Sequence, residues 1–365
     1  MEALIDFYQA AETKAILAFL MSLLLTYLFI PAIIRLAHIK KLYDKQDDRK
    51  KHTARISSLG GMGIFGGLLL SFVFFSAGLF HASLNSFLVG VLVLFITGVK
   101  DDLYPLTPIK KLLGQLLAVG VIVIQGNIRM ETLYGFLGIN ELGYWQSILI
   151  TVAYFILIIN AFNFTDGING LMGLMSFFFF SVYSIWFYYL GDYLHLLLSM
   201  SALGSVLAFL RYNFGNAKIF MGDNGSMVLG YISAILTIRF VQLNEHTPSV
   251  LLEHVDAFVF SISTVALPLV DAFRVMALRV LVYKKHPLIA DRNHFHHYLI
   301  DNGVNAPLAA SIVSVVSLGG MMMAFYLRNM VPSRYLLFII FAYILLSIVL
   351  TRRWFRFKNK TQIHE

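Results

Sequence analysis

Residues 14–34 read KAILAFLMSLLLTYLFIPAII, and Lys14 at the start is the only charged residue among them. A helix of this length spans about 30 Å, the thickness of the hydrocarbon core of a bilayer. Similar apolar runs recur along the chain, so we expect an all-α polytopic membrane protein with about eleven transmembrane helices. The expected spans are residues 14–34, 60–80, 83–98, 111–127, 146–162, 171–190, 193–210, 225–243, 254–276, 306–327 and 335–351.

The composition of the whole chain agrees with this prediction. Of the 365 residues 58% are hydrophobic and 13% are charged, against roughly a quarter charged in soluble domains, and the mean hydropathy is +0.75. These values argue against a disordered chain and against a soluble enzyme. The absence of cysteine excludes disulfides, thiolate metal sites and cysteine nucleophiles. No internal repeat or soluble module stands out, so residues 1–365 are expected to form a single integral membrane domain.

The distribution of positive charge predicts the orientation of the chain. Lys and Arg outnumber Asp and Glu by 28 to 20, and most of them lie in alternate loops and in the C-terminal tail. Because loops rich in Lys and Arg stay in the cytoplasm, we expect the N-terminus outside and the C-terminus inside. The expected cytoplasmic loops cover about residues 35–59, 99–110, 163–170, 211–224 and 277–305. The excess charge therefore reports topology, and no nucleic-acid partner is expected.

Four polar clusters lie beside predicted spans, all at the expected cytoplasmic face. Acidic residues are costly near hydrocarbon, which makes them candidates for function. Each cluster alone has a simpler interpretation as a solvated helix end, a turn or, for the histidines, a surface loop or zinc site. Their joint occurrence on one face favours a shared site. The clusters are Asp101 and Asp102; Asn160, Asn163, Asp166 and Asn169; Asp223 and Asn224; and Arg292, His294, His296 and His297.

These residue types suit a phosphorylated ligand bound together with a divalent cation. Carboxylate and amide oxygens are ligands for Mg²⁺ and Mn²⁺, and Mg²⁺ typically takes one or two carboxylates plus substrate phosphates. Lys111, Arg292 and the histidines would balance the charge of the phosphates. Adjacent Asp101 and Asp102 do not both ionise easily, so one is a candidate proton acceptor. The pattern predicts metal-assisted phosphoryl transfer at the cytoplasmic face of the membrane.

In these clusters the sequence resembles the polyprenyl-phosphate N-acetylhexosamine-1-phosphate transferases, the superfamily that holds WecA, TagO and MraY. The motifs KDDL, NxxNFTDGINGL, FMGDNGS and DRNHFHH occur in the family's order, and eleven spans resemble WecA and TagO more than the ten-span MraY. The resemblance implies that undecaprenyl phosphate attacks a UDP-amino sugar, above all UDP-GlcNAc, giving lipid-diphospho-sugar and UMP. This is the first membrane step of a cell-envelope glycan pathway, such as lipopolysaccharide or teichoic acid synthesis. The implied location is the bacterial inner membrane, with a homodimer as one expected assembly.

The resemblance also implies roles for single residues. Asp101 is expected to act as the base on the lipid phosphate, with Asp102 supporting the metal or the charge balance. Asp223 is expected to be the principal Mg²⁺ ligand, with Asn163 as a second ligand, while Lys111 contacts phosphate. The rest of the substrate would be bound by Asn169 and Phe220 at the uracil, by Asp166 as the organiser of that loop, and by Arg292, His294, His296 and His297 at the diphosphate or the sugar. Direct attack by the lipid phosphate and a covalent aspartyl intermediate both stay open.

The chain departs from the family pattern at two places. Ser57 and Ser58 stand where TagO-like members tend to have Pro-Arg, which leaves the contacts of that loop open. Asn169 replaces the Asp of many bacterial relatives, so a carboxylate role is excluded there, although an amide is compatible with recognition of uracil.

Four further positions, a proline, an acid and two glycines, carry expectations. Pro268 is expected to kink the ninth span and to open an apolar groove for the lipid chain. Asp271 is either a partner of the site or a helix-end residue. The GxGxxG pattern at residues 61–66 begins an apolar span with no strand before it, so Gly63 and Gly67 are interpreted as helix-packing residues.

The alternative from another functional class is a secondary transporter for anionic solutes. It predicts charged residues near the membrane midplane and inverted internal symmetry, whereas the polar clusters here lie at span ends on one side. His195 and Arg239, in or at spans, are interpreted as packing or interface residues. Within the enzyme class, the alternative donors are another UDP-amino sugar and UDP-MurNAc-pentapeptide, and the resemblance favours the plain amino sugar.

Overall fold

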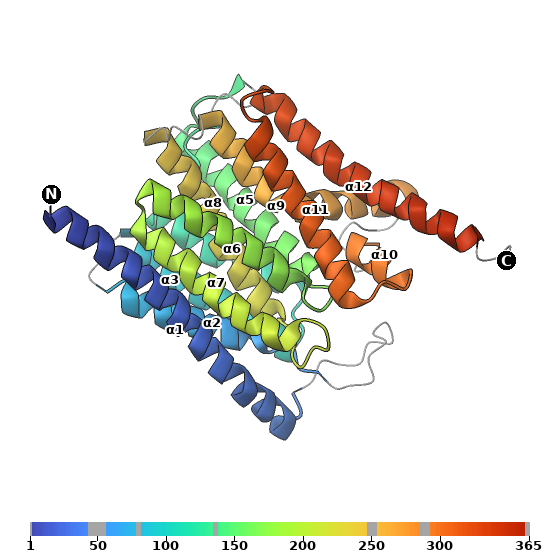
Figure 1. Ribbon diagram of the computed structural model, residues 1–365, viewed down its shortest axis with the longest axis horizontal. Coiled ribbons are helices and arrows are strands. Elements are labelled where there is room, and N and C mark those ends of the chain that lie inside the picture. Colours follow the sequence, from blue (N-terminus) through green and yellow to red (C-terminus); the bar gives the residue numbers. More distant parts are fainter. Residues whose placement is uncertain are drawn as a thin grey trace.

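The computed structural model describes residues 2–42, 56–77, 82–133, 138–246, 254–284, 286 and 293–361. Within this part of the chain the only β-type pairing is an isolated bridge between Thr132 and Glu141. The elements are α1 (Glu2–Lys40), α2 (Gly60–Phe75), α3 (Ala82–Leu103), α4 (Pro108–Gly120), η1 (Val121–Gln125), α5 (Tyr144–Thr165), α6 (Leu171–Leu190), α7 (Tyr193–Asn213), α8 (Asp223–His246), α9 (His254–Ala277), η3 (Leu278–Val282), α10 (Phe295–Asp301), α11 (Ala306–Leu327) and α12 (Ser333–Thr361), where η marks π-helical turns. The prediction of an all-α polytopic membrane protein is confirmed (Figure 1).

Each of the expected spans falls on a helix. Among the described residues, nine helices are long and apolar enough to cross a membrane, and α2 is a shorter apolar helix of 16 residues. The expected ninth span coincides with α9. Figure 1 shows the start of α1 and the end of α12 at opposite ends of the bundle, as an odd number of crossings requires. The count of eleven crossings and their orientation stay predictions.

Some helix boundaries differ from the expected spans. α1 and α12 continue well beyond the apolar runs, through Lys40 and Arg352. Lys and Arg are good helix formers, so the helix continues after the apolar run has ended. α2 ends at Phe75, five residues before the expected end. The short helix α10 was not expected, since seven residues carry too little periodicity to be recognised.

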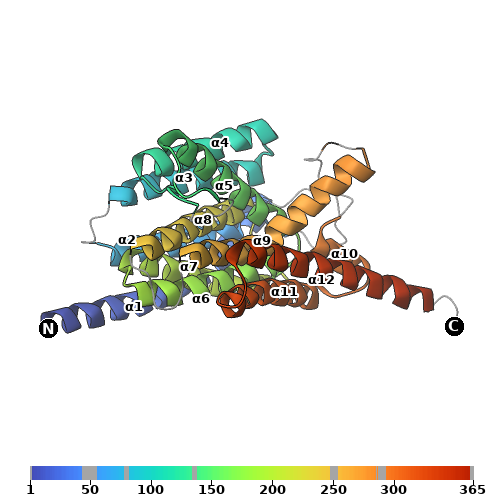
Figure 2. The same cartoon turned by 90° about the horizontal axis from the view of Figure 1, so that it is seen from above.

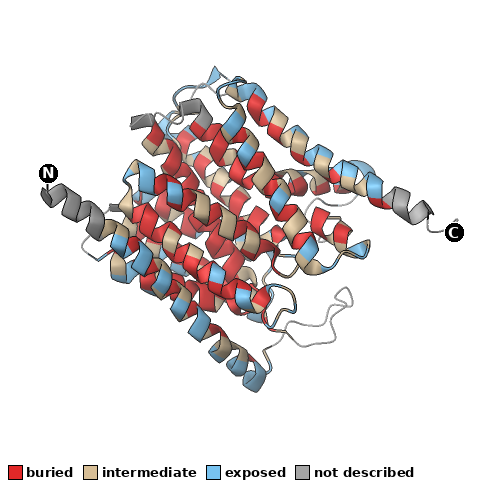
Figure 3. Ribbon diagram, in the orientation of Figure 1, coloured by how far each residue is buried: buried red, intermediate tan, exposed pale blue. Residues whose placement is uncertain are grey.

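α8 is the central helix of the bundle, whereas α1 and α12 lie at its edge (Figures 1 and 3). Residues 224–238 of α8 are all buried. The two edge helices expose large apolar side chains such as Leu24, Leu28 and Phe338, as expected for surfaces that face lipid. Because α8 runs through the middle, its N-terminal end at Asp223 is surrounded by the ends of neighbouring helices.

Two glycines of α2 permit close packing against α1. A Cβ atom on Gly63 would meet the side chain of Ile30, and one on Gly67 would overlap Thr26. The Thr26 hydroxyl donates a hydrogen bond to the Gly63 carbonyl at 3.2 Å. The interpretation of these glycines as helix-packing residues is confirmed.

The later part of α9 leaves the bundle. Pro268 lies inside α9, which is helical on both sides of it. Figure 2 shows this part and η3, in orange, running out from the other helices, and Phe273, Leu281 and Val282 on it are exposed. This segment is therefore not packed on every side, and the expected groove for a lipid chain stays a prediction.

Candidate active site

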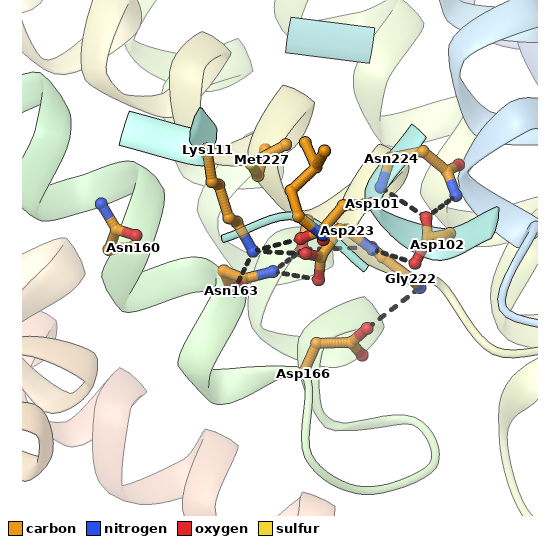
Figure 4. A network of polar contacts seen from close by, with 12 residues as sticks. Asp101, Asp102, Lys111, Asn160, Asn163, Asp166, Gly222, Asp223, Asn224 and Met227 are labelled. Atoms are coloured by element: carbon orange, nitrogen blue, oxygen red, sulfur yellow. Dashed lines mark hydrogen bonds and ion pairs between the residues drawn. The ribbon is translucent and has the colours of Figure 1, made fainter. Parts of the chain in front are cut away.

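Lys111 is the centre of a polar cluster built from the ends of four helices (Figure 4). Its Nζ lies 3.2 Å from Asp101 Oδ2, pairs with Asp223, and donates to Asn163 Oδ1 at 3.0 Å. These side chains come from α4, α3, α8 and α5, so residues remote in sequence meet at one end of the bundle. The side chains of Lys111 and Asp101 are 17% and 13% exposed, which leaves the cluster largely shielded from solvent.

The turn between α3 and α4 brings Asp101 and Lys111 together. Asp101 Oδ1 accepts a hydrogen bond from the Leu106 N–H at 2.6 Å, which closes the turn on the end of α3. Pro108 then begins α4, where its fixed φ suits the first helical turn and its missing N–H is not needed. Lys111 follows one turn later and points back toward α3. The stretch PLTPIKK thus specifies a helical hairpin with a lysine beside its acid.

Asn163 holds the carboxylate of Asp223 from the last turn of α5. Its Nδ2 donates to Asp223 Oδ1 at 2.6 Å and to Ser226 Oγ at 3.0 Å. The carboxyl groups of Asp101 and Asp223 also contact each other. Two carboxyl groups that meet around a single ammonium form a site with strong preference for a cation.

Asp102 caps the N-terminus of α8. Its Oδ1 accepts from the Asp223 N–H at 3.0 Å, and its Oδ2 accepts from the Asn224 N–H at 2.9 Å and from the Asn224 side-chain amide. The first N–H groups of a helix have no partner within it and carry partial positive charge, so a carboxylate is favourable there. Gly98 permits this approach, because a Cβ atom at this position would overlap Asn224. Asp102 thereby fixes the position of Asp223.

Asp166 joins the loop after α5 to the loop before α8. Its Oδ2 accepts a hydrogen bond from the Gly222 N–H at 3.2 Å. Gly222 has a φ of +73°, which glycine adopts without strain, and a Cβ atom there would overlap the Ser58 carbonyl and approach Asp102. This contact is consistent with the organising role expected for Asp166.

Asn213, at the end of α7, forms a second connection between the same loops. Its Oδ1 accepts from the Gly170 N–H at 2.7 Å, and its Nδ2 donates to the Ile219 carbonyl at 2.8 Å. Asn169 lies beside this connection and donates to the Gly215 carbonyl at 3.2 Å. Asn213 is buried and belongs to no motif, so sequence reasoning missed it. The available signal was an amide at the end of an apolar span.

Phe220 is fixed through its backbone by the segment before α2. Its N–H donates to the Ser57 carbonyl at 2.8 Å, and its carbonyl accepts from the Gly60 N–H at 2.9 Å. The Ser58 carbonyl accepts from Asn224 Nδ2 at 3.0 Å. The contacts of Ser57 and Ser58, which the sequence left open, therefore use carbonyl groups and do not require the Pro-Arg of related chains.

His294 is oriented by Asp271 of α9. Its Nδ1 lies 2.9 Å from Asp271 Oδ2, and Asp271 also accepts from the Phe295 N–H at 3.1 Å and pairs with Arg274 at 2.6 Å. Of the two interpretations of Asp271, the structure supports a partner of the site. The same carboxylate satisfies the first backbone N–H of α10, so one acid both begins this helix and holds its neighbouring histidine.

His296 connects the histidine segment, residues 293–297, to the loop after α5. It is buried against Gly167, where a Cβ atom would overlap its ring. The rings of His296 and His297 have centroids 4.3 Å apart. Gly167 follows Asp166 directly, and Asp166 accepts from the Gly222 N–H. His296 therefore packs next to the residue that joins this loop to the start of α8. Arg292, the remaining expected residue, lies outside the described residues.

A pair of amides lies one layer below the Lys111 cluster. Asn160 Nδ2 donates to Gln115 Oε1 at 2.9 Å, and Gln115 Nε2 donates back to Asn160 Oδ1 at 3.4 Å. Gln115 follows Lys111 by one turn of α4, and Asn160 precedes Asn163 by about one turn of α5. The pair therefore ties α4 to α5 beneath the cluster. Sequence reasoning missed Gln115, although a buried amide inside an apolar span was the signal.

The donor set at Lys111 fits a divalent cation that shares its ligands with substrate. Asp101 and Asp223 offer carboxylate oxygens on one ammonium, the ligand type that Mg²⁺ and Mn²⁺ prefer. In the described part of the chain no group of three or more His, Asp or Glu residues is arranged to hold a metal unaided. The protein would thus supply one or two carboxylates, and phosphate oxygens would complete the coordination, as is typical of Mg²⁺.

A second charged cluster lies at the other end of the bundle. Asp192 caps α7 and lies 2.8 Å from His195 Nδ1 and 2.9 Å from Arg239 Nε. Burial alone would raise the pKa of Asp192, but these two partners outweigh burial and hold its pKa well below the usual range. Arg239 lies sixteen residues along α8 from Asp223, about 24 Å at 1.5 Å per residue, so this cluster is separate from Lys111. Its contacts agree with the packing roles expected for His195 and Arg239.

The chain is similar to known proteins over the region that contains this site. The family model described as glycosyl transferase family 4 matches residues 84–241, a range that contains the whole Lys111 cluster. A probable undecaprenyl-phosphate N-acetylglucosaminyl 1-phosphate transferase of Bacillus subtilis (strain 168) is 30% identical over 307 residues, 83% of this chain and 82% of the relative. An undecaprenyl-phosphate alpha-N-acetylglucosaminyl 1-phosphate transferase of Yersinia pestis is 25% identical over 361 residues, 94% and 92% of the two chains. A decaprenyl-phosphate N-acetylglucosaminephosphotransferase of Mycobacterium leprae (strain TN) is 27% identical over 278 residues, 70% and 69%.

Proposed function

The chain belongs to glycosyl transferase family 4, and from this membership we propose that it transfers N-acetylglucosamine 1-phosphate from UDP-N-acetylglucosamine to undecaprenyl phosphate, releasing UMP. The names of the relatives support both the sugar and the lipid. The observation that carries the proposal is the convergence of Asp101, Lys111, Asn163 and Asp223 at one end of a bundle of membrane helices. The transporter alternative has no support from the relatives, which are transferases.

The position of the site suits one lipid and one soluble substrate. The lipid keeps its phosphate at the membrane interface and its chain in hydrocarbon, so the reacting groups must meet where helices end. Every residue of the Lys111 cluster lies at such an end. We place this end at the cytoplasmic face of the bacterial inner membrane, because the loops beside it carry most of the Lys and Arg.

The reaction exchanges one bond at phosphorus. An oxygen of the lipid phosphate bonds to the sugar-linked phosphorus of the UDP-sugar, and the bond from that phosphorus to the bridging oxygen breaks, its electron pair leaving with UMP. Asp101 accepts a proton when the lipid phosphate arrives protonated. Lys111 offsets the negative charge of the phosphates, and Asn163 keeps the Asp223 carboxylate turned toward them. Direct attack needs no covalent protein intermediate and is the simpler route.

We also propose Mg²⁺ as the cofactor, with Mn²⁺ as a substitute. Asp223 would hold it, with Asn163 as the second ligand that the sequence predicts and with Asp101 beside them as a second carboxylate. When bound, the ion neutralises charge on the diphosphate and aligns it for displacement. Asp102 contributes through α8, since its three hydrogen bonds fix the backbone that carries Asp223.

The nucleotide and the sugar are assigned to the loops around the cluster. Asn169 and Phe220 would bind the uracil, supported by the connection that Asn213 makes between their two loops. His294 and His296 would contact the diphosphate or the sugar, supported by the packing of His296 on Gly167.

One assay tests the proposal. Purified protein is incubated with undecaprenyl phosphate, Mg²⁺ and, in turn, UDP-GlcNAc, UDP-GalNAc or UDP-MurNAc-pentapeptide, and UMP release is measured. We expect release with UDP-GlcNAc, none after Asp223→Asn, and full activity in Glu141→Gln, a matched change at an exposed acid outside the site. Release with UDP-MurNAc-pentapeptide alone would replace the sugar, and UMP release by Asp223→Asn at the wild-type rate would remove the proposed role of Asp223.

A further inference from the structure

Arg352, near the C-terminal end of α12, contacts the histidine segment. Arg352 Nη2 donates to the Asn293 carbonyl at 2.9 Å, and its guanidinium lies 4.9 Å from the centre of the Tyr298 ring. The Tyr298 hydroxyl donates back to the Arg352 carbonyl at 2.9 Å. The chain directly before His294 is therefore held from α12, a helix that carries none of the family motifs.

A second arginine donates to the same oxygen as Arg352, the carbonyl of Asn293. Arg274 of α9 donates from Nη2 to the Asn293 carbonyl at 2.7 Å. Because both guanidinium groups bind one oxygen, they lie side by side although their charges repel. Guanidinium groups stay protonated at all physiological pH values, so neither can relieve this repulsion by losing a proton.

Among the residues that the structure describes, little negative charge faces this pair. Asp271 pairs with Arg274 at 2.6 Å, and the same carboxylate also contacts His294 Nδ1 and accepts from the Phe295 N–H. Two permanent positive charges and a histidine thus share one acid among the described residues. Such an excess is the usual setting in which proteins bind phosphate groups.

Two donors of the pair also lack acceptors. Arg274 Nη1 and Arg352 Nε are buried and make no hydrogen bond within the described part of the chain. A buried, charged donor without an acceptor is destabilising, since it has lost water and gained nothing in exchange. A phosphate group has several oxygens and can accept hydrogen bonds from more than one guanidinium N–H.

We infer that Arg274 and Arg352 form a phosphate-binding site beside the histidine segment, separate from the Lys111 cluster. The ligand class is a phosphate group, either on the headgroup of a membrane lipid or on a soluble nucleotide. The site rests on the charges and donors of this pair and does not depend on the proposed reaction. Binding would replace the mutual repulsion of the guanidiniums by shared attraction to one anion, and would hold Asn293 and His294 in place.

The test uses the full-length protein in nanodiscs of phosphatidylcholine, with inorganic phosphate as the probe and the thermal unfolding midpoint as the readout. We compare the wild type with Arg352→Gln, which removes the charge but keeps an amide donor, and with Arg353→Gln, the same change at the exposed neighbouring arginine. Losing one charge-assisted contact is expected to raise the half-saturating phosphate concentration roughly tenfold in Arg352→Gln. Arg353→Gln is expected to match the wild type.

Two further arms identify the source of the phosphate. The choline of phosphatidylcholine neutralises its headgroup phosphate. Replacing part of this lipid by the anionic phosphatidylglycerol therefore raises the midpoint and removes the response to added phosphate if an anionic lipid headgroup occupies the site. If UMP acts in pure phosphatidylcholine at lower concentration than phosphate, and this advantage is lost in Arg352→Gln but kept in Arg353→Gln, the site is assigned to a nucleotide. If Arg352→Gln does not fold, Arg352→Lys takes its place, with an intermediate loss expected because lysine lacks the planar fork. Equal half-saturation in the Arg352 variant and the wild type, or no response of the wild type to any of these anions, overturns the inference.

Discussion

Replacing Asp102 by asparagine tests whether this acid positions Asp223 or takes part in the chemistry. The carboxylate accepts hydrogen bonds from two backbone N–H groups at the start of α8, at 3.0 and 2.9 Å, and from the Asn224 side chain. The introduced amide would keep one acceptor oxygen, but its NH₂ group would face an N–H donor. We therefore expect the start of α8 to shift and to move Asp223 away from Lys111.

The expected cost follows from these contacts. One hydrogen bond to a charged acceptor is worth about 1.5–3 kcal/mol, and replacing a good helix cap costs about 0.5–2 kcal/mol, with the two effects overlapping. A loss of about 2–4 kcal/mol in stability is the result. Since 1.4 kcal/mol is about a factor of ten, the well-placed Asp223 conformation would become roughly 30-fold to several hundredfold less populated relative to displaced ones.

The assay is UMP release across a range of Mg²⁺ concentrations, together with thermal unfolding in the same detergent. We expect Asp102→Asn to lower both the unfolding midpoint and the turnover. Asp101→Asn is the matched control, because Asp101 accepts only one backbone N–H and should therefore lose turnover with a smaller loss of stability. An Asp102→Asn protein that unfolds like the wild type but has no turnover would refute the positioning argument and put Asp102 in the reaction itself.

Three other outcomes are expected. Lys111→Met should lower turnover about 10²–10³-fold, the usual effect of removing one group that stabilises transition-state charge, and UMP release within tenfold of the wild type would contradict its role. Chelation by EDTA should abolish UMP release, and added Mg²⁺ or Mn²⁺ should restore it; activity that persists in EDTA argues against a dissociable metal. The folded-state pKa of Asp192 is lowered, so its stabilising effect is present above the unfolded pKa of about 3.9 and is lost as the pH falls below that value. Unfolding measured from pH 3 to 7 should show a weaker acid dependence in Asp192→Asn, and an unchanged slope would count against this cluster.

The sequence predicted the helices and most members of the site, because both leave local signals. A run of about twenty apolar residues reports a span regardless of its neighbours, and an acid or amide beside such a run is costly unless it has a use. Asp101, Asn163 and Asp223 carry that signal and meet at Lys111. The sequence could also place them on one face by counting crossings.

The different contacts of the two adjacent acids in the site could not be predicted in this way. Asp101 and Asp102 are adjacent in sequence and alike in chemistry, yet one pairs with Lys111 and the other caps α8. The role of each acid depends on how α3 is rotated against α8, and the close approach of Gly98 to Asn224 is part of that packing. Contacts of this kind depend on two distant positions at once, and a single sequence gives no sign of their pairing. The same holds for Arg352, whose partner Asn293 lies 59 residues away.

The buried middle of the bundle determines the spacing of the groups at its end. Gly230 lies two turns along α8 from Asp223, and a Cβ atom there would come within 2.9 Å of the Ile159 Cα and 3.2 Å of the Phe162 Cβ. α5 and α8 therefore touch along their backbones directly below the point where Asn163 bonds Asp223 at 2.6 Å. In a bilayer such close packing is a main source of helix association, since burial of apolar surface gives no advantage over lipid. The contact between Asn163 and Asp223 thus depends on the close packing at Gly230, because only a fixed distance between the axes of α5 and α8 holds an amide of one helix on a carboxylate of the next.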